Sequence, residues 1–387
     1  MKVIFYTHDL FIGREHLMPW RTLIEVAKYF QNAKKWKVKI FSGEINAQFV
    51  NRFYQDINII SVPKPSQELA KTIEKENADI LYWPVVWRDR KKSFSDINSF
   101  KGNIIAYFPG GVYNITNIIK AIPLIGIKAA LPYVFEIITP KSFLINKLKK
   151  NGFAGLIAFS NFTFNKAINA GWIENEGKVI FPGKGTFQTI SADQTLITDL
   201  KLNGKKFFVF MGAPAPIRGS KYLLKAFDRF ASKNKESVLV CLMRKDPDSD
   251  FSRFNDSLNK LKNQNNVIPI YDLLSPNQLK GFIDNAIAVI LPFIMIPSEI
   301  PLTFFEVLSC GTPILTFTNG GTSEYISGCS LISRPGNTNS LSRNMEEIWE
   351  NKALRTQLSL RAKELMKNHP TWKQVGENWA NFIYAIL

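Results

Sequence analysis

Residues 298–314 read SEIPLTFFEVLSCGTPI. This stretch predicts a loop, a helix that begins near Leu302, and a Gly-Thr-Pro turn into a strand. The start of a helix presents backbone N–H groups and a partial positive charge, which suit a diphosphate. A carboxylate in the first turns can accept hydrogen bonds from both hydroxyls of a ribose, and Glu306 is placed for that role. The alternative is that Glu306 only complements the charge of the helix start.

Short β-rich runs alternate with helical patterns through the rest of the chain. This alternation predicts parallel sheets with helices on both faces. In the first half we expect strands at residues 3–6, 36–41, 57–62, 78–82, 104–108, 155–160 and 179–181. In the second half we expect them at residues 206–211, 238–243, 267–270, 288–291 and 314–317.

The length of 387 residues suggests two domains. We expect a first domain at residues 1–185, a linker at 186–205, a second domain at 206–370 and a last helix at 371–387. The apolar residues of the last helix recur at helical spacing, so it could pack back across the gap between the domains.

Composition excludes several classes of protein. The three cysteines are scattered and there are only three histidines, which argues against a disulfide framework, a zinc site or a His-rich metal centre. The sequence contains neither a run of about 20 apolar residues nor a secretory signal, so we expect a cytoplasmic protein. The net charge is +17, and residues 1–187 hold 26 basic and 14 acidic side chains. This basic excess suits nucleic acid, an anionic membrane or a phosphorylated small molecule.

Further motifs follow one another in a fixed order. They are Ser160 with Gly171 and KVIFPG at 178–183, Gly212 to Gly219 with YLLKAF at 222–227, EVLSCGTP at 306–313, GGTSEYI at 320–326, and Trp372 with the final helix. In this order they resemble motifs of the group 1 glycosyltransferases. Those are retaining enzymes of the GT-B architecture, an α/β fold in which two Rossmann-like domains face a cleft and the C-terminal helix crosses back to the first domain.

The resemblance implies transfer of a sugar, with retention of configuration, from a UDP- or GDP-sugar to a lipid-linked or polysaccharide acceptor. It also implies that side chains rather than a metal ion stabilise the departing diphosphate, so we expect no cofactor. Arg218 and Glu299 are the expected catalytic residues. The expected donor-binding residues are Gly13, Gly212, Arg218, Arg244, Ser298, Thr303 and Glu306.

Two departures from the family pattern leave a second interpretation open. Ser298 stands where the first Glu of the family's Glu-x7-Glu pair is expected, with Glu299 one residue later. Ala213 replaces the first cation of the phosphate loop, whereas Arg218 keeps the second. The alternative is therefore a GT-B protein that binds nucleotide sugars with weak or no transfer.

We expect no nucleic-acid partner, because no nucleic-acid module is recognisable. The carboxylates of residues 246–250 are expected to form a solvated turn rather than a metal clamp.

The acceptor side is expected in the first half of the chain. Its candidate residues are Trp83, Trp87, Arg88, Arg90, Gly110 and Gly111. The aromatic rings beside cations could stack on an acceptor sugar, lie at a lipid headgroup layer, or form the edge of the core. Residues 113–138 are apolar but interrupted by lysines and prolines, so they could lie on a bilayer or form a buried insertion at the acceptor cleft. We therefore expect a possible peripheral location on the inner face of the cell membrane.

Overall fold

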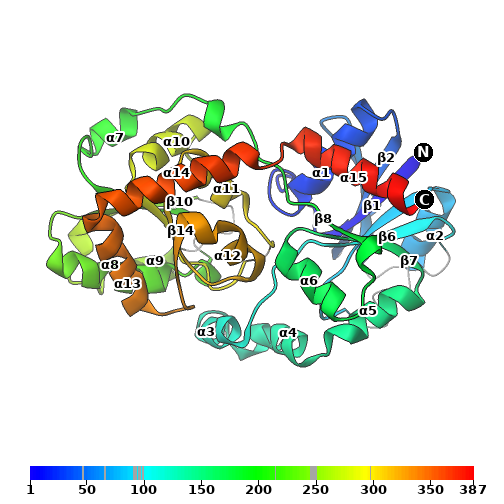
Figure 1. The fold of residues 1–387 in the computed structure, drawn as a ribbon, viewed down its shortest axis with the longest axis horizontal. Coiled ribbons are helices and arrows are strands. Elements are labelled where there is room, and N and C mark those ends of the chain that lie inside the picture. The colour runs from blue at the N-terminus through cyan, green and yellow to red at the C-terminus, as the bar shows by residue number, and fades with distance from the viewer. Residues whose placement is uncertain are drawn as a thin grey trace.

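Two β-sheets, one in each of two lobes, organise the chain in the computed structural model (Figure 1). The structure describes residues 1–45, 48–64, 67–89, 94, 97, 100–213, 215–244, 251–296 and 298–387. The predicted fold class, an α/β fold with two Rossmann-like domains, is confirmed.

The first sheet has eight strands in the order β3-β4-β2-β1-β5-β6-β7-β8. All neighbours pair in parallel except β3, which lies antiparallel to β4 at the edge. The sequence did not predict β3, because its five residues have exposed or half-exposed side chains and lack an apolar pattern. The strands are β1 (Lys2–His8), β2 (Lys37–Ile45), β3 (Val50–Tyr54), β4 (Ile57–Lys64), β5 (Ile80–Pro84), β6 (Asn103–Phe108), β7 (Phe153–Ala158) and β8 (Gly177–Val179).

Helices cover both faces of this sheet, so its central strands are buried on both sides. On one face lie α1 (Trp20–Asn32) and α15 (Trp372–Ile386). On the other lie α2 (Gln67–Lys75), α5 (Lys141–Lys150) and α6 (Asn161–Asn169).

The second sheet has six parallel strands in the order β11-β10-β9-β12-β13-β14. They are β9 (Phe207–Gly212), β10 (Val238–Met243), β11 (Val267–Ile270), β12 (Ala288–Leu291), β13 (Ile314–Phe317) and β14 (Ser330–Ser333). Strands β10 to β13 have the predicted bounds. The edge strand β14 was not predicted, because serines occupy both of its ends.

The helices of the second lobe also form two layers. One layer contains α8 (Ser220–Lys233), α9 (Ser252–Leu258) and α13 (Thr338–Glu350). The other contains α7 (Thr195–Asp199), α10 (Pro276–Asn285), α11 (Leu302–Ser309) and α12 (Gly320–Ile326), with α14 (Lys352–Asn368) contributing to both. Short 3₁₀ turns lie at Glu174–Glu176, Phe187–Thr189, Pro216–Arg218, Gln264–Asn266 and Ser327–Cys329. Ile197 and Leu202 are buried in this core, so residues 186–205 are not a free linker.

The last helix, α15, completes the core of the first lobe, as predicted for a helix that crosses back (Figure 1). Trp379 is fully buried, with ring centroids 4.8 Å from Tyr82 and 6.0 Å from Phe5. The chain that leads into α15 leaves the second lobe beside Lys184, whose backbone N–H donates to the Pro370 carbonyl at 2.9 Å. The first sheet therefore depends on residues at the far end of the chain.

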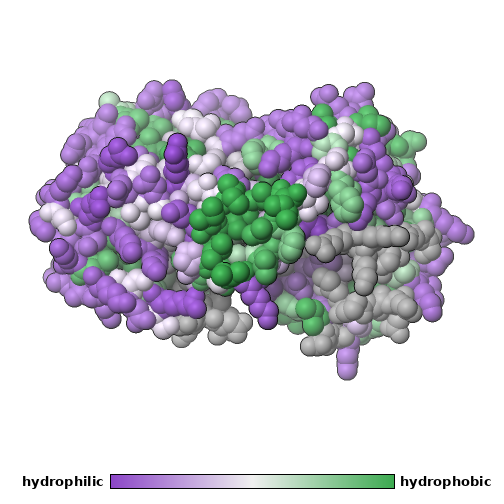
Figure 2. Space-filling view, turned by 90° about the horizontal axis from the view of Figure 1, so that it is seen from below, coloured by the Kyte–Doolittle hydropathy of each residue, from purple (hydrophilic) through white to green (hydrophobic). Residues whose placement is uncertain are grey.

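Residues 115–138 form two helices that lie beneath both lobes, α3 (Ile115–Ile125) and α4 (Ile127–Ile138) (Figure 1). Helix α3 packs on the second lobe, where Asn117 Nδ2 donates to the carbonyls of Ile294 at 2.9 Å and Thr318 at 3.0 Å. Helix α4 contacts the first lobe through Glu136, 3.9 Å from Arg88. The inner side of the segment is buried, as Ile118 and Ala121 show, whereas its outer side is exposed and carries the hydrophobic patch of Figure 2. Among the described residues, no helix combines the length and apolar character needed to cross a bilayer.

We predict that Trp379→Ala destabilises the protein by about 3–5 kcal/mol, because it leaves a large cavity between α15 and the first sheet. Urea unfolding followed by circular dichroism measures the change. The matched control is Glu377→Ala, which alters an exposed residue of the same helix and should change stability by less than about 0.5 kcal/mol. Equal unfolding midpoints for the two variants would show that α15 is dispensable to the first lobe.

Candidate functional site

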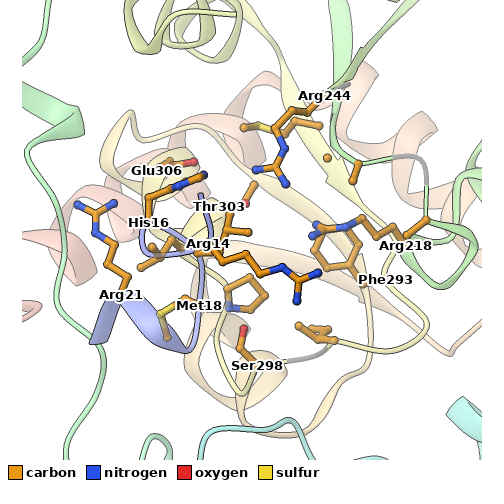
Figure 3. Close-up of a pocket in the computed structure, with 18 of the residues that line it drawn as sticks. Arg14, His16, Met18, Arg21, Arg218, Arg244, Phe293, Ser298, Thr303 and Glu306 are labelled. Carbon is orange, nitrogen blue, oxygen red and sulfur yellow. The ribbon is translucent and has the colours of Figure 1, made fainter. Parts of the chain in front are cut away.

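A cavity of about 1270 Å³ lies between the lobes (Figure 3). In the second lobe, its walls come from the segments after β9, β10, β11 and β12, and those after β9 and β12 lie at the centre of the sheet. These two strands are neighbours in the sheet, and the strand order reverses between them. In the first lobe, the wall comes from residues 11–21, after β1. In open α/β sheets, ligands bind at the carboxyl ends of the strands where the order reverses. The cavity therefore has the position of a ligand site.

Gly212 and Arg218 form one wall of the cavity. Gly212 has φ +143°, and a Cβ built there would lie 3.2 Å from Arg218 Cδ and Nη1. A side chain at this position would displace Arg218, so the glycine lets the arginine lie against the backbone. The Arg218 guanidinium is stacked 5.0 Å from the centroid of Phe293, another cavity residue. The predicted phosphate-loop cation is therefore held at the cavity by an aromatic ring.

The start of α11 faces the same cavity. Pro301, Leu302, Thr303 and Glu306 all line it. No side chain caps this helix start, so the positive end of the helix is available to an anion. Burial raises the pKa of Glu306 above its ordinary value, while the positive charges of Arg21 and Arg244 act in the opposite direction. Figure 3 places Glu306 and Thr303 on one side of the cavity, with Arg244 and Arg218 across from them.

The loop after β1 is fixed by a buried carboxylate. Glu15 Oε2 accepts the backbone N–H of Gly13 at 2.7 Å, and Oε1 accepts from Arg52. Arg52 also donates to the Leu10 carbonyl at 2.7 Å. Gly13 lines the cavity as predicted, but its amide hydrogen is already bound. Arg14, the next residue of this loop, also lines the cavity and brings a positive charge to it.

Arg14 reaches from the first lobe toward Arg218 (Figure 3). Its guanidinium lies 4.7 Å from the centroid of Phe11 and 5.5 Å from that of Trp20. Arg14 was not among the predicted site residues, although its place directly after Gly13 in the loop that follows the first strand was a usable signal. Among the residues that the structure describes, the cavity lining carries five arginines and two carboxylates: Arg14, Arg21, Arg218, Arg244 and Arg253, with Asp272 and Glu306. This excess of positive charge suits an anionic ligand.

Ser298 and Glu299 are on opposite sides of their backbone segment. Ser298 lines the cavity. Glu299, which was expected in catalysis, is absent from the lining, and its buried Oε1 accepts from Ser160 Oγ at 2.6 Å and from the Gly321 N–H at 3.1 Å. The contact joins the start of α6 in the first lobe to the start of α12 in the second. The Glu299 carboxylate therefore does not take the place of the Ser298 side chain at the cavity.

The acceptor-side candidates divide into buried and exposed residues. Trp83 and Trp87 are only 3% exposed and belong to the first-lobe core, so of the three alternatives the core edge is confirmed and a lipid-facing position is wrong. Arg88 is exposed and lies 5.0 Å from the Tyr133 centroid. A Cβ built on Gly111 would lie 2.6 Å from the Ile296 carbonyl oxygen, so this glycine allows the lobes to approach beside Ser298. Gly110 is half-buried beside it.

Some of the predicted features lie outside the described residues, namely Arg90 and the carboxylates of residues 246–250. In the part of the chain that the structure describes, no group of three or more His, Cys, Asp or Glu side chains is arranged to hold a metal ion.

Comparisons with known proteins agree with this architecture. HepE of Anabaena in complex with UDP and glucose superposes with a TM-score of 0.70 at 14% identity, with 100% of each chain covered. A glycosyltransferase of Rickettsia africae gives 0.66 at 18% identity, covering 100% of this chain and 98% of that one. Sucrose-phosphate synthase of Thermosynechococcus elongatus gives 0.69 at 13% identity, covering 99% and 98%. No curated protein sequence matches.

These superpositions show that the whole chain has the GT-B fold. Residues 194–365 match the family of glycosyl transferases group 1. The second lobe therefore matches the family that the motifs resemble, and the predicted resemblance to group 1 glycosyltransferases is confirmed.

We predict that Glu299→Gln alters the pH dependence of stability. Burial raises the pKa of Glu299 to about 6 from an ordinary value of 4.5, against the opposing effects of its hydrogen bonds with Ser160, Thr163 and Gly321 and of the Lys166 charge. The folded chain therefore binds this proton more tightly than the unfolded chain. The resulting stabilisation is present below pH 4.5 and is lost as the pH rises through 6, by about 2 kcal/mol in total.

Urea midpoints of the wild type and Glu299→Gln between pH 5 and 8 measure this effect. The variant should gain on the wild type as the pH rises, whereas Glu324→Gln, at an exposed position on α12, should follow the wild type. Parallel curves for wild type and Glu299→Gln would contradict the assignment.

Proposed function

We propose that the protein transfers a sugar from a nucleotide-sugar donor, with retention of configuration, to a glycan or lipid-linked acceptor. One observation carries the proposal: the start of α11, Glu306 and the cavity arginines meet at the point where the strand order of the second sheet reverses. A diphosphate, a ribose and a sugar need an anion site, a hydrogen-bond acceptor and a neighbouring space, and this cavity supplies all three.

The donor is oriented by α11 and the loop after β9. Its ribose hydroxyls donate to the Glu306 carboxylate, and its diphosphate binds at the amides of the first turn of α11 and at Arg218. The sugar then lies toward Ser298 and the first-lobe loop. HepE in complex with UDP-glucose and trehalose-6-phosphate of E. coli bound with UDP-2-fluoro glucose have similar folds, which supports a UDP-sugar as the donor.

In the transfer step, the bond between the anomeric carbon and the diphosphate oxygen breaks, and a bond from the acceptor oxygen forms on the same face. The nucleoside diphosphate leaves with the bonding electron pair, and its leaving oxygen accepts the proton that the acceptor hydroxyl loses. Arg218 and Arg14, one from each lobe, stabilise the charge that develops on the leaving oxygen. In this mechanism the two arginines stabilise the leaving diphosphate as a metal ion would, so we expect activity without a metal ion.

A second candidate function is nucleotide-sugar binding with weak or no transfer. The observation that favours it is the hydrogen-bonded position of Glu299 away from the cavity, with Ser298 in its place. A hydroxyl binds sugar hydroxyls but carries no charge, so it interacts less strongly with an electron-deficient sugar than a carboxylate does. Donor affinity without turnover would distinguish this candidate.

We further propose that the acceptor is reached at a membrane surface. The basic excess of the first half of the chain and the exposed hydrophobic side chains of α3 and α4 support this location. The membrane contact is then peripheral.

The proposed function is tested with a panel of UDP-, GDP-, ADP- and dTDP-sugars. We expect one UDP-sugar to raise the melting temperature, since a ligand at one hundred times its Kd adds about 2.7 kcal/mol. With glycan or lipid-linked acceptors, EDTA-treated protein should form a product whose anomeric configuration, measured by proton NMR, matches that of the donor. An inverted anomer would exclude retention, and binding without any product would favour the second candidate.

We predict that Glu306→Gln weakens UDP binding by about ten- to one-hundredfold, because it removes the charge from the hydrogen bonds to the ribose. Calorimetric titration measures the affinity, and circular dichroism checks the fold. Glu350→Gln, at an exposed end of α13, is the control and should bind UDP like the wild type. Unchanged affinity in the folded Glu306→Gln protein would remove Glu306 from the donor site.

A further inference from the structure

The outer side of α3 and α4 carries a row of exposed hydrophobic side chains. We call it the α3–α4 surface. Its members are 43–69% exposed: Ile115, Ile119, Ile127, Leu131, Phe135 and Ile138. Along α4 they recur three or four residues apart, so they project from one side of the helix. Figure 2 shows a continuous hydrophobic patch on the underside of the molecule, the side on which α3 and α4 lie in Figure 1. Contiguous patches of this kind mark interaction sites.

The segment that carries the α3–α4 surface has mostly basic charges. Residues 113–150 contain six lysines and a single acidic residue, Glu136. Glu136 is buried between Arg88 and Lys141, so it offers no negative charge to a partner. The exposed charges of this segment are therefore all positive, including Lys128 on α4 and Lys149 and Lys150 at the end of α5. Hydrophobic side chains among lysines fit a bilayer interface with anionic headgroups.

A second copy of the chain fits this surface less well. A two-fold dimer would place the same patch opposite itself, so the lysines of one copy would face those of the other without carboxylates to pair with. An anionic lipid surface supplies both an apolar layer and negative charge. The charge complementarity thus favours lipid over self-association.

The α3–α4 surface is connected to the cavity through a short stretch of chain. Residues 109–114 lead from β6 into α3, and Gly111 is packed against the Ile296 and Ser298 carbonyls. Tyr113 donates its hydroxyl to the Ile296 carbonyl. Since Ile296 and Ser298 line the cavity, a bilayer at α3 and α4 would lie beside the cavity wall rather than behind either lobe.

We propose that the α3–α4 surface inserts into the interface of an anionic bilayer and holds the cavity beside the headgroups. This proposal rests on the proposed function in one respect, namely that the acceptor comes from the same bilayer. Lipid binding itself is measured without any substrate, so it can be tested separately. Insertion differs from purely electrostatic attraction, because its hydrophobic part persists at high salt. The Trp83 and Trp87 rings take no part, since they are buried.

The experiment is flotation of the full-length protein with vesicles of phosphatidylcholine alone or with 40% phosphatidylglycerol. We expect binding to the anionic vesicles, part of which remains at 0.5 M NaCl. The variant I127S/L131S/F135S should lower the partition coefficient by at least about tenfold. The control I173S/L360S removes side chains that are 48% and 63% exposed elsewhere, and it should bind like the wild type.

A second measurement tests the proposal even if the triple variant does not fold. An environment-sensitive dye on Leu131→Cys should shift to the blue on anionic vesicles and be quenched by brominated lipid, while the dye on Leu360→Cys should not respond. Labelled wild type corrects for Cys310, which is partly exposed. The proposal is overturned if the wild type does not float, if the folded triple variant floats equally well, or if both dyes respond alike. Concentration-dependent sedimentation that the triple variant abolishes, without flotation, would assign the surface to a dimer instead.

Discussion

Two helices hold the lobes together, because each follows one lobe in the sequence but packs on the other. Helix α15 follows the second lobe but completes the core of the first through Trp379. Helix α3 follows the first sheet but packs on the second lobe through Asn117. Burial of a large aromatic ring and saturation of a buried amide both oppose separation. Because of these two ties, the carboxyl ends of the two sheets face each other across one cavity.

That arrangement concentrates positive charge at the cavity, where the arginines that the structure describes outnumber the carboxylates. Arg14 comes from the first lobe, while Arg218 and Arg244 come from the second, so the cations converge only when the lobes are in place. Stacking on Phe293 restricts Arg218 before a ligand arrives. Less side-chain entropy is then lost on binding. The same geometry explains why Glu299 is buried away from the ligand, since its hydrogen bonds with Ser160 and Gly321 help to close the lobes on each other.

The sequence predicted those features that depend on local pattern. The buried strands β10 to β13 and the helix α15 have strong apolar periodicity, and Glu306 follows a recognisable helix start. The sequence could not tell which of Ser298 and Glu299 faces the cavity, because that depends on Ser160, which is 139 residues away from Glu299. It also could not tell that Trp87 is buried, since tryptophans beside cations occur both in cores and at membranes. The edge strand β3 lacks an apolar pattern because its side chains are exposed or half-exposed, and β14 was missed because serines occupy both of its ends.

A crystal structure of the protein with UDP bound tests most directly whether the cavity is a nucleoside-diphosphate site. We expect the ribose hydroxyls to lie within hydrogen-bond distance of the Glu306 carboxylate, with the diphosphate at the start of α11 and in contact with Arg218. UDP bound outside this cavity, or bound in it with the ribose away from Glu306, would contradict the assignment of this site.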